Sequence, residues 1–290
     1  MTATIRNPGS WSVDQIGAMG RHVGAYTASV GSDETAELPQ VRRLGFEDLR
    51  LALRRGMEDF AACRSDVAFL CLLYPVIGIV MAWVAFHNAL LPLVFPMMAG
   101  FALVGPVAAV GLYEMSRRRE RGEPASFADA FRVAASPSFG AIFALGLMLF
   151  ATFIAWMIVA DQIHQLTLGP DAPASFGIFL TQVFTTAAGW TMILVGLGVG
   201  FLFAVAVLAT SVISFPMLLD RKVGLPVAVV TSIRVTRENP GVIGAWGAIV
   251  AGALLAGSIP AFLGLIVVMP VLGHATWHLY RRAVIWPDRT

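Results

Sequence analysis

The chain has little charge and little cysteine. Only 13% of its 290 residues are charged and 57% are hydrophobic, whereas about 25% of the residues of a soluble domain are charged. Its two cysteines, Cys63 and Cys71, have no His or Cys neighbours and make no recognisable metal motif. No Gly-rich phosphate loop, Ser–His–Asp motif or catalytic carboxylate pair is visible. The composition therefore excludes a soluble globular domain and gives no positive sign of an enzyme.

The long apolar segments contain no Lys or Arg. All 20 cationic residues fall in four stretches, namely 1–66, 114–138, 220–241 and 281–290. Sixteen of the 18 acidic residues share those stretches, so the basic side is a mixed layer and no nucleic-acid platform. Lys and Arg gather on the cytoplasmic side of membrane proteins. The pattern predicts a multi-pass membrane protein with both termini in the cytoplasm.

The apolar segments predict an all-α, polytopic fold in which six transmembrane helices form three hairpins. A helix needs about 20 apolar residues to cross about 30 Å of hydrocarbon. The expected spans are 67–86, 91–113, 139–160, 190–218, 242–257 and 259–280. Two spans within 175–219, with a turn at 196–200, would place 220–241 on the wrong side. We therefore predict an interfacial or re-entrant helix at 175–187 before one long fourth span.

Each hairpin follows a segment with the pattern of a cytoplasmic amphipathic helix. In the first helix, residues 44–60, the apolar face comprises Phe46, Leu49, Leu53, Met57 and Phe60. The polar face of that helix comprises Glu47, Asp48, Arg50, Arg54, Glu58 and Asp59. The second helix begins at a Ser126/Asp129 capping box, and the third covers 226–238. The expected organisation is a flexible tail at 1–40, one membrane domain at 41–285 and a short tail at 286–290.

The three hairpins have features of an internal repeat. The second span of each carries a proline near its cytoplasmic half: Pro106, Pro216 and Pro270. A polar residue and arginines follow at each membrane exit. The alternative is three unrelated hairpins with ordinary exits.

Three sets of motifs resemble a known family. The first is Asp48-Leu49, Ala52-Leu53, Gly56 and Asp59-Phe60. The second is Gly100 to Pro106, Gly111 to Glu114, Ser116-Arg117-Arg118 and Arg121 to Pro124. The third is Phe215-Pro216, Leu219-Asp220, Thr231-Ser232 and Asn239-Pro240. Over about 40–285 the chain resembles the bacterial domain-of-unknown-function 2189 family. The resemblance implies a polytopic inner-membrane protein and brings no activity with it.

Charged residues at the membrane exits are the main candidates for a working surface. If the hairpins pack around a common axis, these residues converge and could contact lipid headgroups or a partner's loop. The candidates are Glu114, Arg117, Arg118, Arg121, Asp220, Arg221, Asn239 and Arg281. The alternative is that the acids pair with neighbouring arginines and only anchor the span ends.

Histidines offer weaker candidates. His274 and His278 are four residues apart and could hold one metal ion, but Trp277 between them favours an interfacial belt. His87 and His164 lie at far-side ends, where solvation is the simpler expectation. We expect no cofactor. Five histidines are also too few for the six-histidine core of a haem–copper oxidase.

The favoured function is therefore that of a non-enzymatic accessory or interaction protein. Its cytoplasmic face would contact membrane lipid or a membrane-protein complex, such as a respiratory one. One alternative is a transporter or channel for a small solute, although no charged residue lies mid-span, where coupled carriers commonly need one. A second alternative is a lipid-modifying enzyme that uses His274, His278 or Asp220.

Overall fold

The computed structural model describes most of the chain after the expected tail. The described residues are 38–63, 76, 78–80, 83, 90–126, 129, 133, 136–171 and 173–286. The predicted first span, 67–86, lies mostly outside these residues. Most of the short helix expected after Ser126 lies outside them as well.

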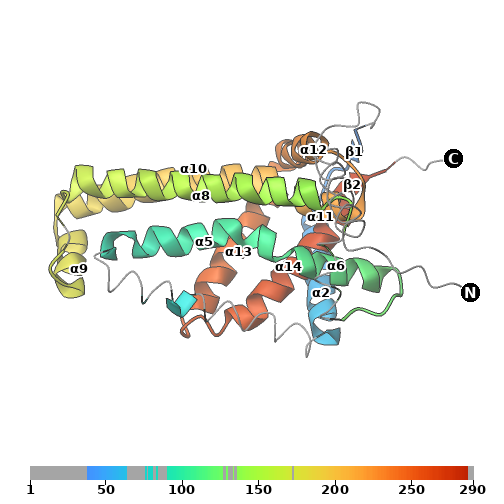
Figure 1. Ribbon diagram of the computed structural model, residues 1–290, viewed down its shortest axis with the longest axis horizontal. Helices are drawn as coiled ribbons and strands as arrows, with labels where there is room; N and C mark the ends of the chain where they lie inside the picture. Colours follow the sequence, from blue (N-terminus) through green and yellow to red (C-terminus); the bar gives the residue numbers. More distant parts are fainter. Residues whose placement is uncertain are drawn as a thin grey trace, which may run out of the picture.

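Helices account for nearly all of the described structure (Figure 1). They are α2 (Phe46–Ala62), η1 (Leu91–Leu93), α5 (Val94–Ala108), α6 (Val110–Glu120), α8 (Phe139–Thr167), α9 (Phe176–Thr185), α10 (Ala187–Ser211), α11 (Ser214–Asp220), α12 (Leu225–Glu238), α13 (Pro240–Ser258) and α14 (Leu265–Ala283). The long helices α8 and α10 lie side by side along the long axis of the molecule. Helix α9 lies at one end of this axis, and α2, α6, α11 and α12 lie towards the other.

Four helical stretches are long and apolar enough to cross a membrane. They are Leu91–Glu120, Phe139–Thr167, Ala187–Asp220 and Pro240–Ser258, and they contain the predicted spans two to five. On α10, Leu194, Phe201 and Leu202 are 68%, 67% and 65% exposed, as expected of side chains that face lipid. Helix α14 covers most of the predicted sixth span but is not one of the four. The complete six-span arrangement thus remains a prediction.

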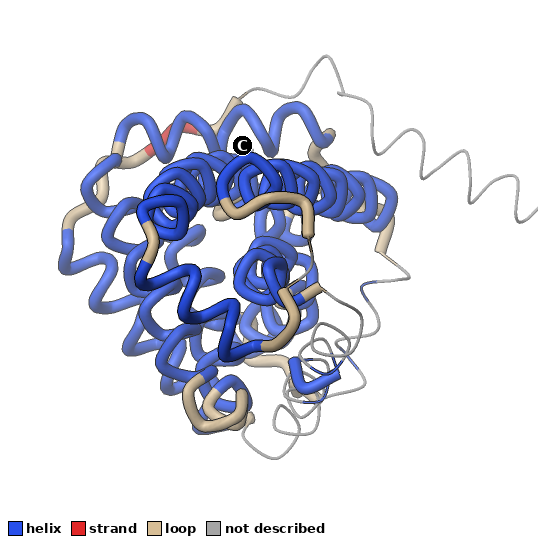
Figure 2. Tube along the Cα trace, turned by 90° about the vertical axis from the view of Figure 1, so that its left-hand side faces the viewer, coloured by secondary structure: helices blue, strands red, loops and turns tan. Residues whose placement is uncertain are grey.

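Residues 175–219 form the short helix α9 and, as expected, one long helical stretch, which consists of α10 and α11. The Ser175 hydroxyl caps α9 by accepting the Ile178 N–H at 3.3 Å, and the Thr186 hydroxyl caps α10 by accepting the Gly189 N–H at 3.0 Å. Helix α10 continues without a turn through 196–200. Figure 2 looks along the long axis from the end at which α9 lies. The position of α9 at that end agrees with an interfacial or re-entrant helix.

Helix α2 packs closely on α14. An added Cβ at Gly56 would lie 2.7 Å from the backbone nitrogen of Ala275, so only glycine fits at this crossing. The buried residues of α2 are Asp48, Leu49, Ala52, Gly56 and Asp59. The predicted faces were therefore partly wrong, because Phe46 and Met57 are exposed while two acids are buried. The acids are buried because each binds cationic or polar partners on other helices.

The two ends of the described chain meet at the same place. Strands β1 (Gln40–Val41) and β2 (Val284–Ile285) pair antiparallel, with Gln40 opposite Ile285. Gln40, the last residue of the expected tail, is thus part of this pair.

The connection between α13 and α14 is longer than predicted. It covers 259–264, where the tight turn was expected at 258–260. Ala261 and Phe262 adopt the left-handed conformation, with φ of 48° and 65°. These strained residues stop the helix, so α14 begins only at Leu265.

Candidate functional site

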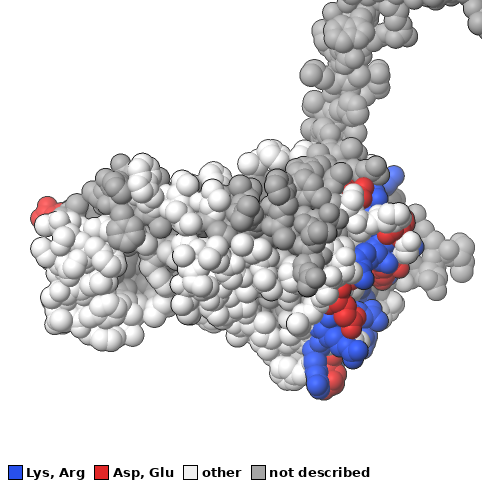
Figure 3. Space-filling view, turned by 90° about the horizontal axis from the view of Figure 1, so that it is seen from below, with Lys and Arg blue, Asp and Glu red and all other residues white. Residues whose placement is uncertain are grey.

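The charged side chains gather at one end of the molecule (Figure 3). In that view the Lys and Arg atoms lie at the right-hand end, mixed with acidic atoms, while most of the described surface elsewhere is uncharged. We call this the charged end. It contains the C-terminal turns of α6 and α14, together with α11 and the segment after it.

Glu114 binds two arginines of its own helix. Its carboxylate lies 2.7 Å from Arg117 Nη2 and 2.9 Å from Arg118 Nε. Arg118 also reaches Asp129 at 3.1 Å, and Arg117 Nη1 donates to the Leu219 carbonyl at 2.7 Å. The spacing of three and four residues places these groups on one face of α6. The cluster joins α6 to the end of α11.

Asp220 is the second acidic centre. Its Oδ2 accepts the Tyr280 hydroxyl at 2.9 Å and lies 3.4 Å from Arg281 Nη1. Arg121 and Arg221 approach the same carboxylate at 3.7 Å. Asp220 therefore links α11 with α14 and with the end of α6. The structure brings Asp220 together with Arg121, Arg221 and Arg281, as expected.

A pocket lies between these two centres. Its volume is about 300 Å³. We call it the arginine pocket, and it is lined by Glu114, Arg117, Arg118, Val133, Ser136, Pro137, Ser138, Leu219, Asp220, Arg221 and Lys222. Five of the eight residues predicted as contact candidates line it. The sequence analysis did not name Lys222, Ser136 or Ser138 as contact candidates. For the two serines, the one available signal was their position just before an apolar span.

Asn239 lies apart from this pocket. Its Oδ1 accepts the Leu44 N–H at 2.6 Å, and its Nδ2 donates to the Arg42 and Val235 carbonyls at 3.2 and 3.1 Å. The residue therefore holds the segment before α2 against the end of α12. Grouping it with the contact candidates was wrong, because its polar atoms are used within the fold.

A buried polar cluster centred on Asp59 joins three helices. Asp59 Oδ2 accepts the Ser116 hydroxyl at 2.6 Å and His278 Nε2–H at 2.9 Å, and Arg119 Nε lies 3.4 Å from Oδ1. Ser116 Oγ also lies 2.7 Å from His274 Nδ1. Because the hydroxyl proton goes to the carboxylate, His274 Nδ1–H donates to the Ser116 oxygen. Asp59, Ser116, His274, His278 and Arg119 form what we call the Asp59 cluster.

Electrostatics favours the ionised form of both buried acids of α2. Burial opposes ionisation of Asp59, but hydrogen bonds from His278 and Ser116 outweigh it and lower the pKa of that carboxyl. Burial likewise opposes ionisation of Asp48. The Gly45 N–H and the guanidinium groups of Arg282 and Arg42 lower its pKa nonetheless. The two acids thus fasten α2 to α14, Asp48 through Arg282 and Asp59 through His278.

The Asp59 cluster revises the prediction for the histidines. His274 and His278 are 0% and 8% exposed, so an interfacial belt is wrong. His278 Nε2 binds Asp59 and His274 Nδ1 binds Ser116, while His274 Nε2 is buried and has no hydrogen-bond partner among the described residues. No group of three or more His, Cys, Asp or Glu within the described ranges could hold a metal ion. His164 is buried beside the Phe179 ring, and His87 lies outside the described residues.

The composition of the cluster, with Ser, His and Asp, is that of a nucleophilic triad, but its geometry is different. In a triad the base accepts the hydroxyl proton. Here the Ser116 hydroxyl donates to the carboxylate, and Ser116 is 0% exposed. The arrangement therefore fits a structural link between helices.

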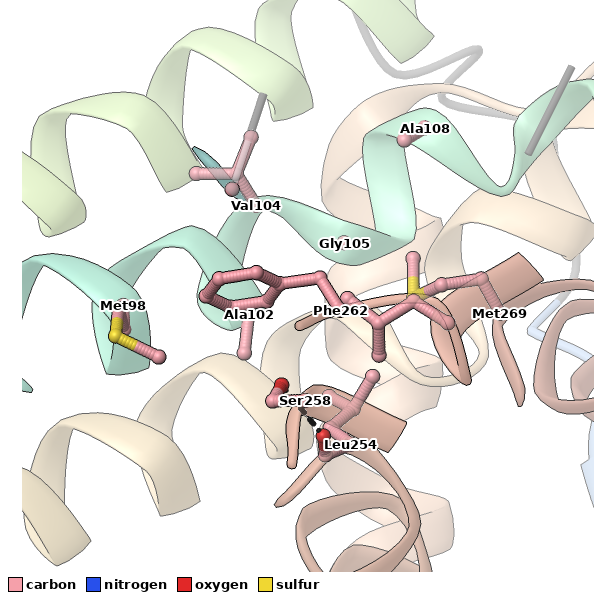
Figure 4. Close-up of a pocket in the computed structure, with 11 residues that line it drawn as sticks. Met98, Ala102, Val104, Gly105, Ala108, Leu254, Ser258, Phe262 and Met269 are labelled. Carbon is pink, nitrogen blue, oxygen red and sulfur yellow. Dashed lines mark hydrogen bonds between the residues drawn. The ribbon is translucent and has the colours of Figure 1, made fainter. Parts of the chain in front are cut away.

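A second cavity lies inside the apolar body, between α5, α13 and α14 (Figure 4). Its volume is about 110 Å³. Met98, Ala102, Phe262 and Met269 are among its lining side chains. Ser258, a polar lining residue, donates its hydroxyl to the Leu254 carbonyl at 2.8 Å. The cavity thus offers a mainly apolar surface.

Fold and charge distribution together define an integral membrane protein with a charged end. Residues 94–220 match the model of a family described as predicted integral membrane proteins (DUF2189). This match confirms the resemblance found in the motifs. The matched range contains the whole second motif set and, from the third, Phe215-Pro216 and Leu219-Asp220. No curated protein and no solved structure matches the chain.

Proposed function

We propose that the chain is a non-enzymatic accessory or interaction protein of the bacterial inner membrane. Its apolar helices embed it in the bilayer, and its charged end lies in the cytoplasm and contacts membrane lipid or a membrane-protein complex. The observation that carries this proposal is the arginine pocket at the charged end. Cationic side chains from two separate parts of the chain line it beside an apolar body.

The orientation rests on the distribution of Lys and Arg. All 20 cationic residues lie in the four stretches assigned to the cytoplasm. Cytoplasmic loops carry an excess of such residues. Three of these stretches, which include Arg117, Arg221 and Arg281, meet at the charged end through the Glu114 and Asp220 centres. The described part of the first stretch joins them through Asp48 and Asp59.

The alternative of a solute transporter has less support. It would use the cavity between α5, α13 and α14, which is small and mainly apolar. The hydroxyl of Ser258 is already bonded to a backbone carbonyl. Such a lining favours packing over a hydrated path. A lipid-modifying enzyme is less supported still, because His274, His278 and Asp220 are all engaged in interactions within the fold.

Purification after mild detergent extraction tests the proposal. We expect the wild-type protein to retain a bound component, either lipid or partner subunits, and to lose it when the exposed cations of the charged end are replaced. Size-exclusion chromatography with mass determination measures this. A protein that always elutes alone and free of lipid would contradict the proposal.

A further inference from the structure

The arginine pocket has more cationic groups than its acids require. Glu114 is bound by Arg117 and Arg118, and Asp220 already has Tyr280 and Arg281. Lys222 is exposed and forms no ion pair within the part of the chain that the structure describes. Lys222 is therefore available to an added anion. Arg221 beside it lies 3.7 Å from Asp220 and over the Trp286 ring, and its side chain is half exposed.

One guanidinium of the pocket also has an unused donor. Arg117 Nε is buried and has no hydrogen-bond acceptor among the described residues. A buried donor without a partner destabilises the fold. Arg117 nevertheless stays in place, because its other nitrogens bind Glu114 and the Leu219 carbonyl. An acceptor inside the pocket would satisfy this donor.

Helix α8 adds further donors. Its 29 residues begin next to the pocket, with Ser138 as the N-cap residue. Ser138 lines the pocket, and its side chain makes no capping hydrogen bond. Ser136 accepts the Ser138 N–H at 3.2 Å, and its hydroxyl has no acceptor among the described residues. A helix N-terminus carries a partial positive charge and binds phosphate groups.

We propose that the arginine pocket binds the phosphate of an anionic phospholipid headgroup. Arg117, Arg221 and Lys222 supply the charge, and the hydroxyl groups of Ser136 and Ser138 at the start of α8 supply further donors. The headgroup is favoured over a free phosphate because the pocket opens where the apolar helices α8 and α11 meet the charged end. The inference rests on the proposed function and names the ligand of the same surface.

Binding to purified protein in a neutral detergent tests this assignment. The probes are phosphatidylglycerol, phosphatidylcholine with the same acyl chains, and inorganic phosphate, with thermal stabilisation as the readout. The pocket variant is the double substitution Arg221→Gln/Lys222→Gln, at two exposed positions. The matched control is Arg234→Gln/Arg237→Gln on α12, which removes the same charge outside the pocket.

We expect phosphatidylglycerol, but not phosphatidylcholine, to stabilise the wild-type protein and the control. The pocket variant should need about tenfold more lipid for each lost cation. Equal weakening of the two double variants would overturn the assignment, because it would mean diffuse surface attraction. Stabilisation by inorganic phosphate as strong as that by the lipid would overturn the headgroup as the source.

The outcome for the pocket is separable from that for the proposed function. If the wild-type protein ignores phosphatidylglycerol but still purifies with partner subunits, only the pocket assignment fails. If it binds neither lipid nor partners, both proposals fail.

Discussion

Replacing Asp59 with Asn is the sharpest perturbation of the fold. The carboxylate is 6% exposed and accepts hydrogen bonds from Ser116 at 2.6 Å and His278 at 2.9 Å. Both bonds go to Oδ2, so an amide oxygen in that place can keep them, but without the negative charge that strengthens them. The NH₂ group would then replace Oδ1 and face the Arg119 Nε donor, which lies 3.4 Å from that atom. A hydrogen bond to a charged group contributes about 1.5–3 kcal/mol. With the unpaired donor added, Asp59→Asn should cost about 3–5 kcal/mol of unfolding free energy.

Glu58→Gln is the matched control, one residue away on the same helix. Glu58 pairs with Arg54 at 3.0 Å, with side chains 56% and 77% exposed. Such a pair contributes about 0.3–0.5 kcal/mol. Thermal unfolding in one detergent should therefore show a large drop in Tm for Asp59→Asn and almost none for Glu58→Gln. Equal Tm values for the two variants would refute the view that the Asp59 cluster holds α2 on α14.

Three further perturbations test other contacts. Gly56→Ala should lower the free energy of unfolding by about 1–3 kcal/mol through overpacking, and so lower Tm. Gly244→Ala, with open space around the added methyl group, should leave that free energy unchanged or raise it by up to about 1 kcal/mol through helix propensity. The opposite order of Tm values would contradict the close crossing. Asn239→Ala should expose the segment before α2 to limited proteolysis, and unchanged cleavage would count against that contact. The pKa values of Asp48 and Asp59 lie below the ordinary 3.8, so their stabilisation is complete above about pH 4 and is lost as pH falls through the lowered values. A Tm that stays constant from pH 5 to pH 2 would contradict this.

Spans two to five and the charged cluster were largely predictable from the sequence. Lys and Arg distribution and apolar segment length yielded the helices that contain spans two to five. The convergence of Glu114 and Asp220 with their arginines followed from their common position at membrane exits. Such features depend on residues that are close in sequence and on the side of the membrane, which the distribution of Lys and Arg along one chain indicates.

Contacts between distant segments were not predictable in this way. Asp59 looked like a solvent-facing acid because its partners, Ser116 and His278, lie 57 and 219 residues away. The first motif did contain the signal, since its Asp48, Leu49, Ala52, Gly56 and Asp59 are the buried residues of α2. The periodicity argument placed Asp48 and Asp59 on the polar face because it considers the charge of each side chain and not its ion-pair partners.

The side of the membrane on which the charged end lies is the claim that every proposal above requires. Single cysteines at Asp171 and Lys222, with Cys63 and Cys71 replaced by serine, can be labelled with a membrane-impermeant thiol reagent in intact bacterial cells whose outer membrane the reagent crosses. We predict that Asp171→Cys is labelled in intact cells and that Lys222→Cys is labelled only after the inner membrane is opened. Labelling of Lys222→Cys in intact cells would contradict the account.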